Sequence, residues 1–89
     1  MNYYIGKINE KNLACRYQHT IRFMASDDRD AEERLVSIAA TFYNGTVGDE
    51  EDDGFYFKHQ GAYVFVSPSS WKVVPEAVYV ELNGYVNEY

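Results

Sequence analysis

The sequence predicts an α+β domain in which one main helix packs on one face of an antiparallel β-sheet of about four strands. Three observations lead to this class. Residues 17–25 alternate between apolar and polar side chains, residues 27–43 carry an apolar stripe with a helical period, and residues 55–67 contain two aromatic runs around a Gln-Gly pair. The expected order is strand, strand, helix, strand, strand, followed by a short C-terminal segment.

A single domain over residues 1–89 is the expected organisation, because the chain is shorter than most domains. A domain of this size hides only about 60% of its unfolded surface, so it needs good packing. The chain has 9 Tyr, 5 Phe and 1 Trp, whose rings bury large areas. We therefore expect an ordered, aromatic-rich core.

Two antiparallel strands are expected first. The aromatic and β-branched residues of "YYIGKI" (3–8) favour a strand, and "NEKN" (9–12) is typical of a turn. In residues 17–25 the odd-numbered residues lie on one face of the second strand and the even-numbered residues on the other.

The main helix is expected over residues 27–43. Ser26 is a suitable N-cap and Asn44-Gly45 a suitable stop. One apolar stripe runs along the helix, consisting of Ala31, Leu35, Ile38, Ala39 and Phe42.

A hairpin is expected after the helix, with strands at 55–59 and 62–67 joined at Gln60-Gly61. The tail is open between two structures. Pro75 can begin a short helix through Leu82, which we prefer, although Val78, Tyr79 and Val80 favour a strand equally.

Charge is distributed unevenly along the chain. The net charge is -6, yet residues 27–53 hold 10 acids against 2 bases, a balance of -8, and the rest holds 6 bases against 4 acids, a balance of +2. Most of this acidity comes from "SDDRDAEE" (26–33) and "GDEEDDG" (48–54).

The five consecutive carboxylates of residues 49–53 admit three interpretations. Asp49, Glu51 and Asp53 match the first, third and fifth positions of a calcium loop, and Gly54 matches the sixth. The twelfth position is Gln60 where the motif needs Glu, so we expect no metal and no cofactor. A solvated turn is the second interpretation, and a surface for a binding partner is the third.

As a binding surface, these acids would face a basic groove on a protein partner, because nucleic-acid-binding proteins line their grooves with Lys and Arg. Neighbouring tyrosines would add apolar anchoring contacts. Acids at the start of the helix have a second explanation, since they stabilise the helix macrodipole. The predicted partner-binding residues are Asp49, Glu50, Glu51, Asp52, Asp53, Asp27, Asp28, Tyr43 and Tyr56.

Two segments resemble RNA-recognition-motif domains. "YYIGKI" is similar to the first-strand hexamer of that family, and "QGAYVFV" (60–66) to its third-strand octamer. The resemblance implies base stacking on the sheet. The family places a helix directly after the first strand, however, and its octamer begins with Lys or Arg. We therefore interpret the sheet aromatics as core or dimer surface and expect no direct contact with nucleic acid.

Catalysis has little support in the sequence. Cys15 and His19 lie four residues apart, which in a strand separates them by about 13 Å, beyond hydrogen-bond reach. No phosphate-binding loop or nucleophile elbow occurs. We expect a non-enzymatic protein.

A cytoplasmic location without membrane contact is expected. Cys15 is the only cysteine, which suits a reducing compartment. The N-terminus lacks a signal-peptide pattern, and the longest apolar run, residues 62–66, is too short to span a bilayer.

In length and in its two acidic segments, the chain is similar to small acidic inhibitors of phages and mobile elements, including anti-CRISPR and antirestriction proteins. This resemblance implies an inhibitor that presents a negative surface to a host nucleic-acid-binding or defence complex. The alternative is a structural or accessory subunit that forms a homodimer through its sheet aromatics.

Overall fold

The computed structural model describes residues 1–13, 15–43, 46–59 and 61–89, apart from the side chain of residue 59. The described residues form an α+β fold, as the sequence predicts, with six strands and two helices. The sequence therefore predicts too few strands. The elements are β1 (Asn2–Asn12), β2 (Cys15–Ala25), α1 (Asp28–Ala40), β3 (Asp49–Glu51), β4 (Gly54–His59), β5 (Ala62–Val74), α2 (Glu76–Glu81) and β6 (Asn87–Glu88).

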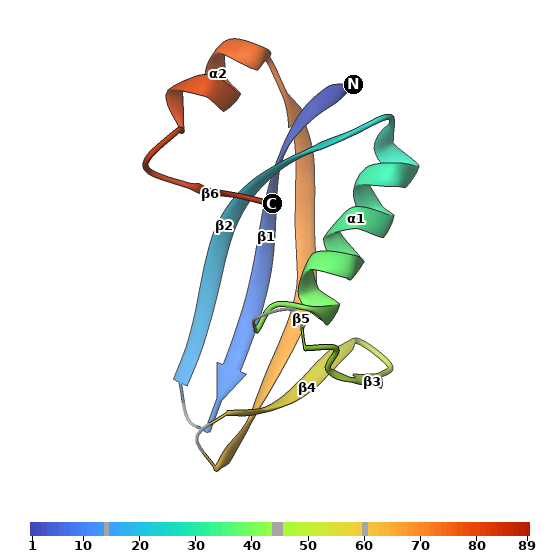
Figure 1. Ribbon diagram of the computed structural model, residues 1–89, viewed down its shortest axis with the longest axis vertical. Coiled ribbons are helices and arrows are strands. Elements are labelled where there is room, and N and C mark those ends of the chain that lie inside the picture. Colours follow the sequence, from blue (N-terminus) through green and yellow to red (C-terminus); the bar gives the residue numbers. More distant parts are fainter. Residues whose placement is uncertain (14, 44–45, 60) are drawn as a thin grey trace.

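All six strands belong to one sheet in the order β3-β4-β5-β1-β2-β6. Neighbouring strands are antiparallel except β2 and β6, which are parallel, so the sheet is mixed rather than purely antiparallel. Helix α1 lies along one face of the sheet and α2 at one end of the molecule (Figure 1). The molecule is elongated, with principal extents of 41 × 25 × 20 Å.

The β1–β2 hairpin is longer than the sequence predicts. Residues 9–12 continue β1 instead of forming a turn, because they pair across to β2 as far as Asn12 opposite Cys15. The same residues pair with β5 on their other side. Two sets of cross-strand bonds outweigh the local turn preference of "NEKN".

The core lies between α1 and the sheet. Tyr4 and Ile8 of β1 and Phe23 of β2 are fully buried there, together with Leu35 of α1. Gly6 allows the helix to approach closely, because a Cβ atom at that position would lie 2.9 Å from Leu35 Cδ1. The period of two in β2 is confirmed, since Ile21, Phe23 and Ala25 face the helix.

Helix α1 begins one residue later than the predicted cap implies. Asp27, rather than Ser26, is the N-cap, and its carboxylate accepts a hydrogen bond of 2.8 Å from the Asp30 amide. Ser26 instead donates its own amide to Asp30 Oδ2. The helix ends at Ala40, before the predicted end at residue 43. The predicted stop Asn44-Gly45 and the turn residue Gln60 lie outside the described residues.

The C-terminal segment forms the helix that the sequence slightly favours. Tyr79 of α2 is buried, and its ring packs against Tyr3 on the face of the sheet opposite α1. Arg22 of β2 lies beneath this segment and donates hydrogen bonds to the carbonyl oxygens of Tyr79 and Val86 and to Asn83 Oδ1, at 2.9–3.1 Å. Arg22 therefore ties this segment to the sheet, in addition to the pairing of β6 with β2.

Candidate functional site

The predicted acidic loop is a β-hairpin. Its first three acids form strand β3, with Asp49 opposite Tyr56, Glu50 opposite Phe55 and Glu51 opposite Gly54 in β4. The remaining acids, Asp52 and Asp53, form the turn. All five side chains are exposed, and none forms an ion pair with another residue that the structure describes.

Buried residues of β4 hold this hairpin in place although its carboxylates repel one another. Phe55 and Phe57 lie in the core, and Gly48 sits against their rings. Gly54 lies so close to β5 that a Cβ atom there would be 2.4 Å from the Val66 carbonyl oxygen. The carboxylates are thus displayed from a fixed backbone.

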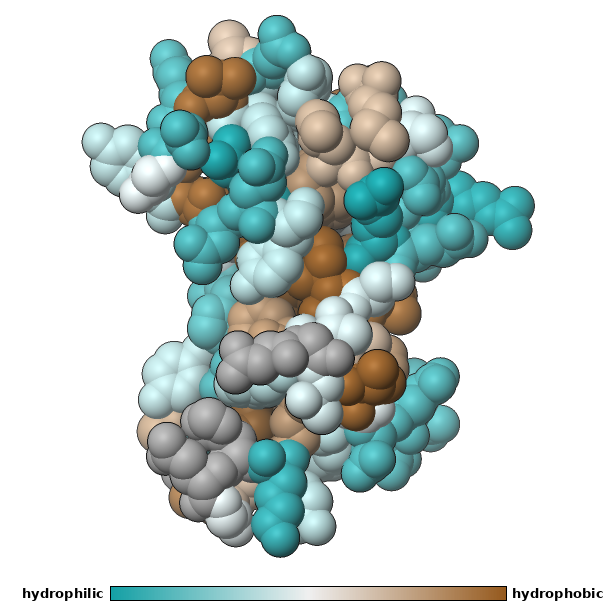
Figure 2. All heavy atoms as spheres, in the orientation of Figure 1, coloured by the Kyte–Doolittle hydropathy of each residue, from teal (hydrophilic) through white to brown (hydrophobic). Residues whose placement is uncertain are grey.

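The hairpin also borders helix α1. Val36 lies beside Glu50, Glu51, Asp52 and Asp53, where they line a shallow cavity of about 140 Å³. The Val36 side chain is 40% exposed. In Figure 2, hydrophilic side chains cover the outer side of α1 and the β3–β4 hairpin. We name Val36 and the five acids of residues 49–53 the acidic surface. It presents carboxylates around one apolar side chain.

The calcium interpretation does not fit this geometry. Asp49 and Glu51 share one face of the extended strand β3 but lie about 7 Å apart along it, and Asp53 follows in the turn, so the three candidate carboxylates are not wrapped around one point. Over the described parts of the chain, no group of three or more His, Cys, Asp or Glu residues is arranged to hold a metal ion.

Asp27 and Asp28 lie away from the hairpin. Asp27 caps α1, and Asp28 accepts a hydrogen bond of 3.1 Å from the buried Tyr4 hydroxyl. Eight residues separate Asp28 from Val36, which is about 12 Å along the helix. The structure therefore gives these two acids local roles and does not join them to the five acids of the hairpin.

Tyr43 and Tyr56 both line a cavity of about 400 Å³ that also contains Asp49, but they differ in availability. Tyr43 packs edge-on against Phe57, with ring centroids 5.2 Å apart. Burial, and to a smaller extent a hydrogen bond to Glu10, raises the pKa of Tyr43 above the usual value of 10. Tyr56 is 40% exposed on the sheet face opposite α1. Only Tyr56 therefore presents substantial free ring surface.

The face of the sheet opposite α1, which we name the open face, carries a feature that the sequence interpretation missed. All six bases outside residues 27–53 lie on it, because they alternate with the buried residues of their strands. A period of two in β1, β2 and β4 signals this grouping, but the strand register is needed to see it. The bases are Lys7, Lys11, Arg16, Arg22, Lys58 and Lys72.

Two other sequence candidates are not assembled into sites. Cys15 is an exposed free thiol at one end of β2, whereas His19 bonds to Glu10 at 3.0 Å and packs against Phe42. In the hexamer similar to RNA-recognition motifs, Tyr4 is buried under α1. The hexamer therefore does not offer Tyr4 for base stacking.

Comparison with protein-family models, with curated protein sequences and with solved structures gives no match for this chain. Within the described residues, no helix has the length and apolar character needed to cross a membrane.

Proposed function

We propose that this chain is a non-enzymatic binding protein that presents the acidic surface to a basic groove on a protein partner. The observation that carries the proposal is the β3–β4 hairpin, in which five adjacent carboxylates are fixed, exposed and without ion pairs among the described residues. A flexible solvated turn has no need of buried anchors such as Phe55 and Phe57. The hairpin instead keeps its charges in constant positions.

Fixed charges favour recognition for two reasons. Their field accelerates encounter with an oppositely charged surface and selects the orientation of docking. Their prior immobilisation lowers the entropy that binding must overcome. Val36 of α1, which lies beside the hairpin, would supply the apolar contact that a purely electrostatic interface lacks.

A partner of this kind is a nucleic-acid-binding protein, since such proteins line their grooves with Lys and Arg. We therefore propose an inhibitor of a nucleic-acid-binding or defence complex as the biological role. We also propose a cytoplasmic location, in which Cys15, exposed and unpaired, stays reduced.

The experiment is a pull-down from host lysate at low and high salt, with the captured proteins identified and then purified. The native chain is compared with a variant in which residues 49–53 are changed to Asn and Gln. We expect only the native chain to capture a basic protein. High salt should release this protein, because the screening length falls to about 3 Å at 1 M. The native chain should also compete with DNA for binding to the purified protein.

A matched pair of single variants controls for net charge. Glu51→Gln and Glu81→Gln remove the same charge from two exposed sites, one on the hairpin and one on α2. Only Glu51→Gln should weaken binding to the purified partner. Equal capture by the native chain and the hairpin variant, or equal weakening by both single variants, would refute the acidic surface as the binding site.

A further inference from the structure

We infer that the open face binds single-stranded nucleic acid, along strands β1, β2 and β5 and onto β4. This departs from the expectation that the chain makes no direct contact with nucleic acid, which the overall negative charge suggests. The strand register gathers the six bases outside residues 27–53 on the open face, where Asp49 and Glu51 of β3 border them, so the net charge does not describe this face.

The first observation is a set of cations without ion pairs to described residues, of which Lys7 donates a hydrogen bond of 3.0 Å to Thr20 Oγ1. Lys7, Lys11, Arg16, Lys58 and Lys72 form no ion pair with any residue that the structure describes. The sixth base, Arg22, is held under α2. Asp49 and Glu51 reach the same face at its β3 edge, opposite Tyr56 and Gly54, but the five exposed or half-exposed cations outnumber them and bind a polyanion or remain solvated.

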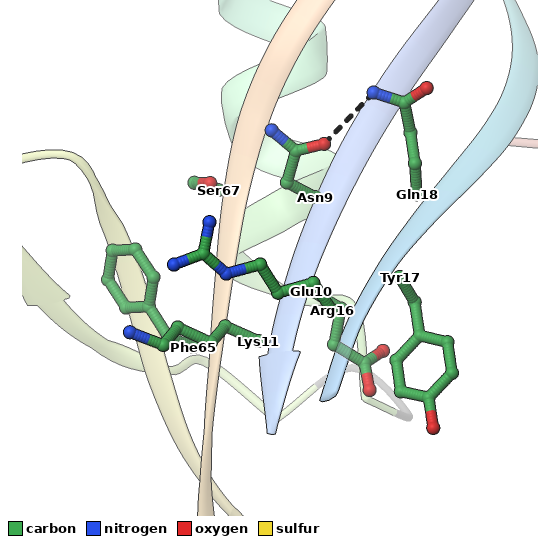
Figure 3. A pocket seen from close by; sticks show the side chains of 8 residues that line it. All are labelled: Asn9, Glu10, Lys11, Arg16, Tyr17, Gln18, Phe65 and Ser67. Carbon is green, nitrogen blue, oxygen red and sulfur yellow. Dashed lines mark hydrogen bonds between the residues drawn. The ribbon is translucent and has the colours of Figure 1, made fainter. Parts of the chain in front are cut away.

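The second observation is a row of side chains across four strands. Arg16 lies opposite Lys11, Lys11 opposite Phe65, and Phe65 opposite Tyr56. In Figure 3, Lys11 and Arg16 extend across β5 towards Phe65, whereas Glu10 points away from them. Cations therefore lie next to aromatic rings on the same surface.

The aromatic rings are available for stacking. Tyr56 and Phe65 pack together with centroids 4.7 Å apart and a tilt of 48°. Tyr63, two residues before Phe65 on the same strand, is 64% exposed. Aromatic rings beside cations form the surface on which proteins bind unpaired bases, because every base has a face that can stack.

The third observation is polar lining in two hollows. The first, of about 350 Å³, lies between the Asn9, Gln18 and Ser67 side chains and the row described above. The second, of about 340 Å³, is lined by Ile5, Lys7, Ser70, Trp71 and Lys72. Amides and hydroxyls at these places can bond to base edges or sugars.

Single strands fit these observations better than duplexes or acidic proteins. A duplex hides the faces of its bases, so it would use the cations but not Tyr56, Tyr63 and Phe65. An acidic protein would likewise gain little from a stacking surface. Glu50 lies on the α1 side of the sheet, opposite Phe55, whereas Asp49 and Glu51 lie on the open face at its β3 edge, so a nucleic acid would lie mainly along β1, β2 and β5, away from that edge.

The test is fluorescence anisotropy with labelled oligothymidine and oligouridine of about 15 nucleotides, within the ~4–16 nucleotides that small domains cover. Five phosphate contacts on a single strand give a slope of about -3.5 for log K against log salt. Affinity should then fall about 100-fold between about 50 and 200 mM salt. Comparison of the affinities for the two oligonucleotides shows whether the open face prefers DNA or RNA.

Charge variants locate the contact. Lys11→Gln with Arg16→Gln should reduce the slope to about -2.1, since two phosphate contacts are lost. The control is Arg29→Gln with Arg34→Gln, which removes the same charge from α1, where both arginines form exposed ion pairs. The control should leave slope and affinity unchanged.

Aromatic variants test the kind of ligand. Tyr63→Leu and Phe65→Leu should each weaken binding by roughly 5- to 150-fold without changing the slope. Tyr85→Leu is the control, because Tyr85 is 87% exposed on the C-terminal segment. Circular dichroism of every variant establishes whether the fold is retained. If Phe65→Leu does not fold, Tyr63→Leu still tests the inference, because the Tyr63 ring is more exposed.

Four results would overturn the inference. The first is no binding by the folded native chain at about 50 mM salt, where the cations are least screened. The second is equal affinity for a duplex, and the third is equal affinity for polyglutamate of the same charge, which would indicate an acidic protein as the ligand. The fourth is dimerisation through Tyr63 and Phe65 in sedimentation analysis, which would assign the face to a second copy of the chain.

Discussion

Replacement of Arg22 by Met tests how the C-terminal segment is held on the sheet. Arg22 is 7% exposed, and its guanidinium donates three hydrogen bonds to α2 and the residues after it and lies 4.7 Å from the centre of the Tyr79 ring. Met keeps most of the aliphatic stem, so little apolar burial is lost.

The magnitude follows from these contacts. A hydrogen bond to a charged group contributes about 1.5–3 kcal/mol, and a desolvated cation–π contact adds up to about 2 kcal/mol. The contributions are not additive, and the freed acceptors of Tyr79, Asn83 and Val86 regain water when the segment loosens. We therefore expect Arg22→Met to lower the free energy of unfolding by about 3 kcal/mol, less than the sum of the separate contacts.

Urea denaturation measures the change in free energy, and hydrogen exchange locates it. Amides of residues 76–89 should lose protection in Arg22→Met, because this segment contains the freed acceptors. Arg16→Met is the control, since Arg16 lies on the same strand and face but is exposed; it should change stability by less than about 0.5 kcal/mol. Equal stability losses in the two variants would refute the role assigned to Arg22.

Three further predictions concern other elements. Gly54→Ala should destabilise the fold by about 1–3 kcal/mol in urea denaturation, because the new Cβ meets a β5 carbonyl oxygen at 2.4 Å; Gly61→Ala, where nothing lies within 4 Å but φ is +83°, should cost only about 1 kcal/mol. Asp27→Ala removes the N-cap bond of α1 and should cost about 1 kcal/mol, with lower helix protection in hydrogen exchange. Burial and a hydrogen bond to Glu88 raise the pKa of Tyr79 to about 12, so the folded state holds the hydroxyl proton more tightly than the unfolded state. The free energy of unfolding should therefore fall as pH rises from about 10 to 12. Tyr79→Phe should remove that part of the pH dependence.

The sequence predicts the α+β class, α1 and the alternation of β2, because each depends on a local period that burial then reinforces. It does not predict that residues 9–12 stay in β1, since that depends on pairing with both β2 and β5. Nor does it predict β3, where acidic residues with low strand preference are held by pairing with the anchored strand β4. Pairing between distant segments decides both cases.

The candidate surfaces show the same division. The exposure of the five hairpin acids is predictable from their charge, whereas the separation of Asp28 from these acids depends on the hairpin docking beside Val36, about 12 Å along α1 from Asp28. The alternation places Gln18, Thr20 and Arg22 on one face of β2. Only the sheet order brings Lys7, Lys11 and Lys72 of other strands onto that same face.

The positions of the acids have a consequence for binding to the open face. The screening length is about 8 Å at physiological salt, so a ligand there is influenced mainly by near acids such as Asp49, which lies opposite Tyr56. At about 0.01 M salt the screening length reaches about 30 Å, which exceeds the shortest extent of the molecule, 20 Å, so the acids of the hairpin and of α1 should all repel a nucleic acid on the open face. Binding to the open face should therefore strengthen less steeply below about 0.01 M than the slope at higher salt implies, whereas Asn and Gln at residues 49–53 should restore the steeper dependence.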